Sequence, residues 1–177
     1  MDAQTNVTST GQKIRTVDIT VTAAMAALVF LGTYIFKIPT ISGYVHLGDC
    51  MILLTVALFG MKKGAIAGGL SDFIGGYFYW VVPTLLIKCM WAIVMGLIMH
   101  KVLKDKKGSF LIGAIAGGVL HIIAYTLVRV VLYGGKTAII EIPALAFQTG
   151  AGIVIGFVIY MLLKKSGVAG RLSGMVK

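Results

Sequence analysis

The chain alternates between long apolar runs and short polar segments. A helix needs about 20 apolar residues to cross the hydrocarbon core of a bilayer. This pattern predicts six transmembrane helices, at residues 19–36, 45–59, 64–82, 83–103, 110–133 and 142–163. The second run is the weakest, because it is short and has His46 and Asp49 near its start. The predicted fold is an all-α membrane protein with six transmembrane helices.

The composition leads to the same class of protein. Of the 177 residues, 58% are hydrophobic and 12% are charged, whereas a soluble domain carries roughly 25% charged residues. There is too little polar surface to cover a water-soluble fold of this size. We expect a single transmembrane domain over residues 1–177, with a cytoplasmic segment at 1–17, a helical bundle at 18–165 and a cytoplasmic tail at 166–177.

Lysine and arginine set the expected orientation, since they accumulate in cytoplasmic loops. With the N-terminus in the cytoplasm, only Lys37 and Lys136 fall in outer segments. Both termini are then cytoplasmic, and topology rather than nucleic-acid binding explains the net charge of +10. The inner segments hold Lys13, Arg15, Lys62, Lys63, Lys101, Lys104, Lys106, Lys107, Lys164, Lys165, Arg171 and Lys177.

Prolines indicate helix boundaries in this predicted topology, and glycines indicate where helices pack closely. The outer connections, such as residues 37–44, mix aromatic, glycine and polar residues, which is typical of loops that shape a site. Three prolines are expected at outer-face boundaries, where a missing N–H is harmless in a first helical turn; they are Pro39, Pro83 and Pro143. Three small-xxx-small pairs predict close helix packing; they are Gly64 with Gly68, Gly113 with Gly117, and Gly152 with Gly156.

Several polar side chains fall inside the predicted spans, where ionisable groups are costly unless they face a cavity or each other. They are His46, Asp49, Asp72, Lys88, His121, Arg129 and the uncharged Gln148. Helical spacing puts Thr84, Lys88, Trp91 and Met95 on one face, and His121, Tyr125 and Arg129 on another. These faces predict a pocket with two cations, a carboxylate and aromatic walls in the outer half of the bundle, as in a small-ligand site.

Structural roles compete with ligand binding at some of these positions. Asp72 is also a candidate intramembrane ion-pair partner for Lys88 or Arg129. Arg129 is a candidate to snorkel to the outer interface, and His121 to donate a hydrogen bond between helices. Trp80 is expected in an interfacial aromatic belt, together with Tyr77 and Tyr79.

Catalytic and nucleotide-binding motifs are not readable in the sequence. Gly135-Lys136-Thr137 echoes the end of a phosphate-binding loop, but valine stands at position 130 where the first glycine is required. No metal spacing is present, so we expect no metal and no cofactor. Active transport would then need a partner or an ion gradient. A stand-alone secondary transporter or channel and a small intramembrane enzyme remain the alternatives.

An ordered series of motifs between Gly43 and Gly96 resembles the substrate-binding S components of energy-coupling factor (ECF) vitamin transporters. The series is Tyr44-Val45-His46-Leu47-Gly48-Asp49, Leu58-Phe59-Gly60, Gly64-Ala65-Ile66-Ala67-Gly68-Gly69, Asp72 with Gly75-Gly76-Tyr77, and Pro83-Thr84 with Ile87-Lys88. The last motif is similar to the T-x-x-x-K start of the fourth span in the riboflavin-type branch. The number of spans, the length and the inside termini extend the resemblance over nearly the whole chain.

The resemblance implies a protein of the bacterial plasma membrane that is not itself an enzyme. S components bind one vitamin in an outward-facing pocket formed by the first loop and the outer helix ends. They dock on a membrane scaffold, the T component, which two cytoplasmic ATPases drive with ATP. Ala23 and Ala27 match the family's Ala-x-x-x-Ala coupling motif. The expected substrate-binding residues are Tyr44, His46, Asp49, Lys88, Trp91, Tyr125, Arg129 and Gln148.

The mixed cationic, acidic and aromatic lining suits a compact heteroaromatic ring that carries hydroxyl groups. This favours a vitamin of the B6 group (pyridoxine) or hydroxymethylpyrimidine, the precursor of thiamine. Pantothenate, with its carboxylate, would suit Lys88 and Arg129 equally well. Riboflavin would need a larger apolar slot.

Overall fold

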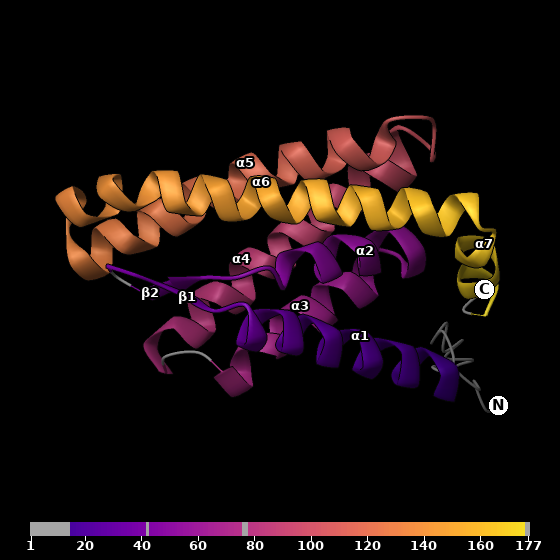
Figure 1. Cartoon of the computed structure of the whole chain (residues 1–177), viewed down its shortest axis with the longest axis horizontal. Helices are drawn as coiled ribbons and strands as arrows, with labels where there is room; N and C mark the ends of the chain where they lie inside the picture. Colours follow the sequence, from indigo (N-terminus) through magenta and orange to yellow (C-terminus); the bar gives the residue numbers. More distant parts are fainter. Residues whose placement is uncertain (1–14, 42, 76–77, 176–177) are drawn as a thin grey trace, which may run out of the picture.

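The computed structural model describes residues 15–41, 43–75 and 78–175, which are mostly helical (Figure 1). The helices are α1 (Thr16–Ile35), α2 (Asp49–Phe59), α3 (Met61–Gly75), α4 (Phe78–Gly96) with its π-helical continuation η1 (Leu97–Val102), α5 (Ser109–Tyr133), α6 (Gly135–Lys165) and α7 (Val168–Gly174). The all-α membrane class is confirmed. The sequence did not predict strands β1 (Ile38–Thr40) and β2 (Gly43–Val45), which form an antiparallel hairpin in the connection between α1 and α2.

Four helices of the described chain are long and apolar enough to cross a bilayer. They are α1, the α4–η1 stretch from Tyr79 to Val102, α5 and α6. Helix α2 has only 11 residues, which at 1.5 Å per residue is about 16 Å. That is roughly half the thickness of the hydrocarbon core. Eight of its residues are buried, so α2 lies inside the bundle and is covered by protein rather than by lipid.

The bundle has two distinct ends (Figure 1). At one end lie the first turn of α1 and helix α7, joined by a hydrogen bond of 2.9 Å from Arg15 Nη2 to the Met175 carbonyl. We call this the basic end, because it carries Lys62, Lys101, Lys164 and Arg171. The β1–β2 hairpin and the turn between α5 and α6 lie at the other, the hairpin end. Helices α2, α3 and α4 pack between α1 on one side and α5–α6 on the other.

The predicted helix boundaries at Pro83 and Pro143 were wrong. Helix α4 begins at Phe78 and α6 at Gly135, so Pro83 and Pro143 both lie inside helices. A proline removes one hydrogen bond, to the carbonyl four residues earlier. For Pro83 that carbonyl belongs to Tyr79, the second residue of α4. The missing hydrogen bond therefore falls in the first turn, and the rest of the helix keeps its bonds. Pro39 lies in strand β1, opposite Tyr44.

The prediction that the glycine pairs are packing surfaces is confirmed. A Cβ atom on Gly113 would lie 2.8 Å from the Met95 carbonyl oxygen of α4, and one on Gly156 would lie 3.2 Å from the Cys50 carbonyl oxygen of α2. Gly48, which precedes α2, is packed as tightly. Its Cβ would lie 2.7 Å from the Val29 carbonyl oxygen and would clash with the Thr33 hydroxyl of α1. The backbones of α1 and α2 therefore approach without a side chain between them.

We expect Gly48→Ala to destabilise the protein by about 1–3 kcal/mol, because an added methyl group in a close-packed contact forces the helices apart. The matched control is Gly150→Ala in α6, where the new Cβ would have no described atom within 4 Å apart from its own stretch of helix. The control should be neutral or stabilising by up to about 1 kcal/mol. The apparent melting temperature in detergent measures both. Equal effects of the two substitutions would contradict the proposed tight contact at Gly48.

Candidate functional site

A buried cluster of polar side chains joins α2, α4 and α6. Asp49, the first residue of α2, and Lys88 of α4 are both fully buried, and Lys88 Nζ lies 3.9 Å from Asp49 Oδ1. Gln148 of α6 donates a hydrogen bond of 2.6 Å from Nε2 to Asp49 Oδ2. Its Oε1 accepts one of 3.2 Å from the backbone N–H of His46. The amide therefore holds the carboxylate and the start of α2 together.

The His46 ring is fixed by the backbone beside it. The N–H of Gly48 donates a hydrogen bond of 3.2 Å to His46 Nδ1. Because a backbone amide can only donate, Nδ1 must carry a lone pair. The His46 ring lies 5.8 Å from the ring of Tyr44 on β2, and Lys37 Nζ lies 3.9 Å from the Tyr44 centroid on the other side of the hairpin. The hairpin thus contacts the buried polar cluster through Tyr44 and His46.

An aromatic column runs beside this cluster toward the hairpin end. The Trp91 and His121 ring centroids are 4.3 Å apart, and His121 meets Tyr125 edge-on at 4.7 Å. Tyr125 stacks on Trp80 at 5.7 Å. Aromatic rings in such pairs offer flat apolar faces with defined orientation. The column supplies the aromatic wall that helical spacing predicted on α4 and α5.

The protonation of His121 can be read from its neighbours. Thr149 of α6 donates its single hydroxyl hydrogen to the Leu145 carbonyl at 2.8 Å. The contact of 3.1 Å between His121 Nδ1 and Thr149 Oγ1 therefore requires Nδ1 to donate. In the neutral ring, Nε2 is then a buried acceptor, and it has no hydrogen-bond partner among the described residues. A hydroxyl of a bound molecule would satisfy it.

A second buried ion pair lies nearer the hairpin. Arg129 Nη2 of α5 is 3.2 Å from Glu141 Oε2 of α6. Thr40 of β1 donates to the same oxygen at 3.1 Å. The Arg129 guanidinium carbon lies 5.9 Å from the Trp80 ring centroid, at the outer end of the aromatic column. This pair ties the hairpin to the two longest helices.

The family model for the ECF-type riboflavin transporter S component matches residues 13–165. This chain belongs to that family. An uncharacterized protein of Pyrococcus woesei is 36% identical over 132 residues, which cover 72% of this chain and 87% of that protein. The protein is therefore a multi-pass membrane protein and a component of a vitamin transporter.

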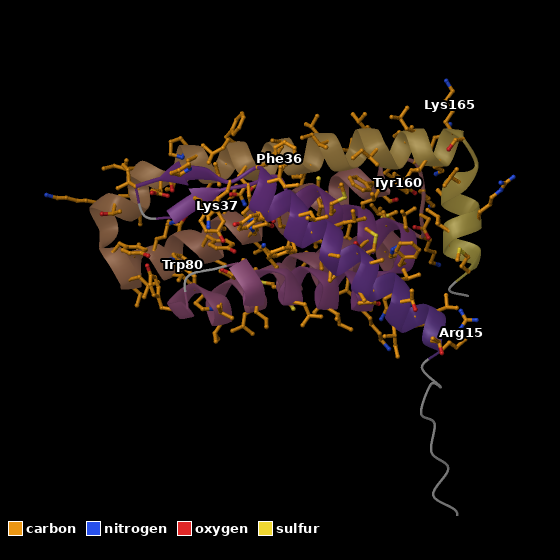
Figure 2. All side chains as sticks on the ribbon, turned by 60° about the horizontal axis from the view of Figure 1, so that its bottom comes forward. Arg15, Phe36, Lys37, Trp80, Tyr160 and Lys165 are labelled. Carbon is orange, nitrogen blue, oxygen red and sulfur yellow. The ribbon has the colours of Figure 1, made fainter. Side chains whose placement is uncertain are left out.

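All eight residues predicted to bind substrate in this S component lie in one contiguous region. His46, Asp49, Lys88 and Gln148 form the polar cluster, Trp91 and Tyr125 belong to the aromatic column, Arg129 lies at its outer end, and Tyr44 stands beside His46. Figure 2 shows Lys37 and Trp80 toward one end of the bundle and Arg15 and Lys165 at the other. Their contact with substrate stays a prediction.

The structure corrects two expectations about individual side chains and confirms a third. Arg129 does not snorkel to the interface, since it is 5% exposed and paired with Glu141. Trp80 is not part of a lipid-facing belt, since it is 8% exposed and donates a hydrogen bond of 2.9 Å to the Tyr133 hydroxyl. The hydrogen bond from His121 to another helix is confirmed, and it leads to Thr149. The Asp72 side chain and Tyr77 lie outside the described residues.

Two residues of the region were missed in the sequence. Glu141 was assigned to a loop, because the sixth helix was expected to begin at residue 142. A carboxylate two residues before a proline in an otherwise apolar stretch was the available signal. Thr149 gave no signal beyond its position next to Gln148. Among the described residues, no group of three histidine, cysteine or acidic side chains is placed to hold a metal ion.

The predicted coupling residues of the S component lie on a different surface. Ala23 and Ala27 are one turn apart on α1, and both are exposed on its outward face. The buried side of α1 consists of Met25, Val29 and Thr33. The outward face is thus free of contacts that the bundle itself requires.

The Asp49–Lys88 pair should behave as a coupled unit in stability measurements. Asp49→Asn or Lys88→Met alone leaves one charge buried without its partner, and each should cost about 3–5 kcal/mol. The double variant should lose clearly less than the sum of the two, because neither charge then remains. Thermal melting of the ligand-free protein in detergent tests this. Additive losses would show that the two groups do not interact.

Proposed function

We propose that this S component captures a small water-soluble vitamin outside the cell and delivers it through a T component and two cytoplasmic ATPases. The observation that carries the proposal is the fully buried Lys88 facing Asp49, with Gln148 and the aromatic column beside them. Buried ionisable groups in a membrane are costly and add little stability over apolar residues of similar size. Their retention here is best explained by recognition of a polar ligand.

The proposed topology has six crossings and both termini in the cytoplasm. Helices α2 and α3 complete the crossings inside the bundle, where protein rather than lipid surrounds the shorter helix. The charge distribution supports this orientation, since the lysines and arginines gather at the basic end while Lys37 and Lys136 lie at the other. The hairpin end, with the binding region beneath it, then faces outward.

The proposed substrate is a compact heteroaromatic ring with hydroxyl groups, such as a B6 vitamin or hydroxymethylpyrimidine. Lys88 would donate a hydrogen bond to a ring nitrogen or to an oxygen substituent of the ring. Asp49 would accept one from a hydroxyl group, and His121 Nε2 offers a second buried acceptor. Trp91 and Tyr125 provide faces for one ring. Pantothenate would use the two cations, Lys88 and Arg129. Riboflavin, which appears in the name of the family, has a three-ring system that would need a longer cavity beside the aromatic column.

The first experiment is mass spectrometry of small molecules released by denaturing the detergent-purified protein. The expected result is one vitamin in a stoichiometric amount, and its mass distinguishes the four candidates. An empty protein that also fails to bind any of the four in calorimetry would contradict the proposal.

Lys88→Ala should weaken binding of the released vitamin at least about tenfold, or 1.4 kcal/mol. The control is Lys136→Ala, which removes an exposed lysine at the hairpin end. It should leave affinity unchanged. Calorimetry on the monodisperse fraction separates loss of binding from loss of folding. The double variant Asp49→Asn with Lys88→Met should also be folded and bind weakly. Unchanged affinity in these variants would remove Lys88 from the site.

Ala23→Trp should leave vitamin binding intact and prevent assembly with the T component, because a bulky side chain blocks close helix approach. The matched control is Ile115→Trp on α5, which replaces another exposed side chain on the outer surface of the bundle. Co-purification of the four-subunit complex and vitamin uptake by vesicles measure the effect. Normal assembly of the Ala23 variant would show that this face of α1 does not couple to the partner.

A further inference from the structure

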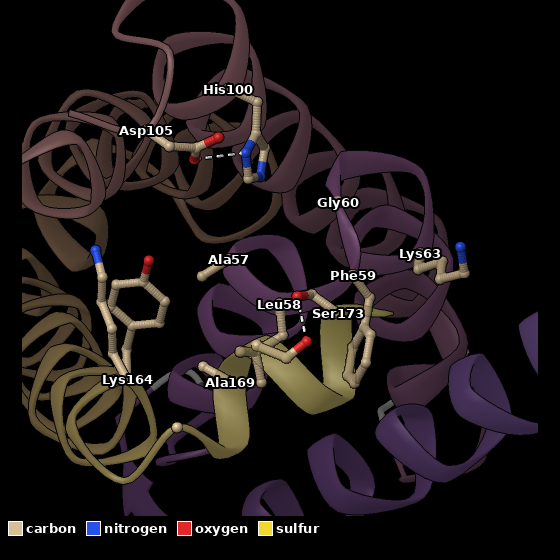
Figure 3. A pocket seen from close by; sticks show the side chains of 13 residues that line it. Ala57, Leu58, Phe59, Gly60, Lys63, His100, Asp105, Lys164, Ala169 and Ser173 are labelled. Carbon is tan, nitrogen blue, oxygen red and sulfur yellow. Dashed lines mark hydrogen bonds and ion pairs between the residues drawn. The ribbon is translucent and has the colours of Figure 1, made fainter. Parts of the chain in front are cut away.

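Two hollows meet at Lys164, at the end of the bundle opposite the proposed vitamin site. One is a pocket of about 580 Å³ between the end of α2, η1 and α7 (Figure 3). The other is a groove of about 530 Å³ on the outward face of α6. Lys164 lines both. Figure 3 shows Lys164 at one edge of the pocket, which Tyr160 also lines.

The groove on α6 is apolar along its length and basic at its end. It is lined by Phe157, Val158, Met161 and Leu162, and at its end by Lys164 and Lys165. Val158, Met161 and Leu162 are 49%, 47% and 62% exposed, so the bundle does not cover them. In a bilayer such residues meet hydrocarbon chains, and a lysine pair at the helix end lies at the depth of the phosphate groups.

Within the part of the chain that the structure describes, no carboxylate neutralises the charges of this lysine pair. Neither Lys164 nor Lys165 forms an ion pair with a described carboxylate. Asp105 lines the same pocket as Lys164, but its Oδ1 lies 2.9 Å from His100 Nδ1, and Asp18 lies 3.2 Å from Lys63 Nζ. Lys164 Nζ lies 5.8 Å from the Tyr160 ring centroid, and this contact holds the lysine over the edge of the pocket.

We propose that this surface binds one anionic glycerophospholipid of the surrounding leaflet. Lys164 and Lys165 contact its phosphate, and one hydrocarbon chain lies in the groove over Val158, Met161 and Leu162. An anionic lipid fits better than a zwitterionic one, because both lysines lack an acidic partner among the described residues. A lipid fits better than a soluble phosphate, because the apolar groove continues directly from the lysine pair. In the topology proposed above, this is the cytoplasmic leaflet.

Native mass spectrometry of the detergent-purified S component tests this proposal with two lipids, phosphatidylglycerol and phosphatidylcholine. The wild-type protein should retain one phosphatidylglycerol at concentrations at which phosphatidylcholine is not retained. Lys164→Gln with Lys165→Gln should weaken this binding at least about tenfold. The control, Lys106→Gln with Lys107→Gln, removes the same charge from the exposed loop before α5 and should change it little. Equal losses in both double variants would overturn the proposal.

The groove has its own test. Val158→Trp fills the groove without changing the charge and should also weaken retention of phosphatidylglycerol. The control is Val131→Trp, at an exposed position of α5, which should not weaken it. Glycerol 3-phosphate, which has the headgroup charge without the chains, should fail to displace the lipid. Retention of phosphatidylcholine equal to that of phosphatidylglycerol would overturn the anionic preference. Displacement by glycerol 3-phosphate at equal concentration would identify a site for soluble anions instead.

Discussion

Burial of the Asp49–Lys88 pair constrains the arrangement of the whole bundle. A charge pair cannot face lipid, so both groups must be enclosed by protein and held by further hydrogen bonds. Helix α2, which begins at Asp49, is accordingly enclosed by the bundle rather than placed on its surface. Gln148 completes the arrangement, because it binds the carboxylate and the backbone of His46 at the same time. The region that holds these charges is therefore enclosed by the helices and linked by hydrogen bonds.

Glycine makes this geometry possible at two helix contacts. A Cβ on Gly152 would lie 3.3 Å from Asp49 Cβ, so its absence lets α6 approach α2 closely, and Gln148 reaches the carboxylate one turn away. Gly117 plays the same part on α5. The Trp91 ring occupies the space that a side chain at Gly117 would fill. It therefore lies against His121, which is one turn further along α5. Helix packing and the placement of polar groups are thus set by the same residues.

The two ends of the bundle differ in chemistry in a way that matches a vectorial task. The hairpin end combines aromatic side chains, two buried ion pairs and a strand connection tied down by Thr40. The basic end has exposed lysines and a short helix, α7, packed across it. Between them, α1 presents Ala23 and Ala27 outward without using them in the core. The surfaces proposed for ligand binding, partner docking and contact with lipid headgroups are therefore separate.

Hydropathy and helical spacing alone determined the membrane class, the faces carrying Lys88 and Tyr125, and the glycine contacts, because these depend on residues one or two turns apart. Because polar and ionisable groups are costly inside a bilayer, the sequence also identified His46, Asp49 and Gln148 as unusual. The partners of the charged groups came only from tertiary structure. Asp49 of α2 faces Lys88 of α4, and Glu141 of α6 faces Arg129 of α5 across the turn that joins these two helices. The helix starts before Pro83 and Pro143 and the hairpin were likewise decided by packing, which no local pattern encodes.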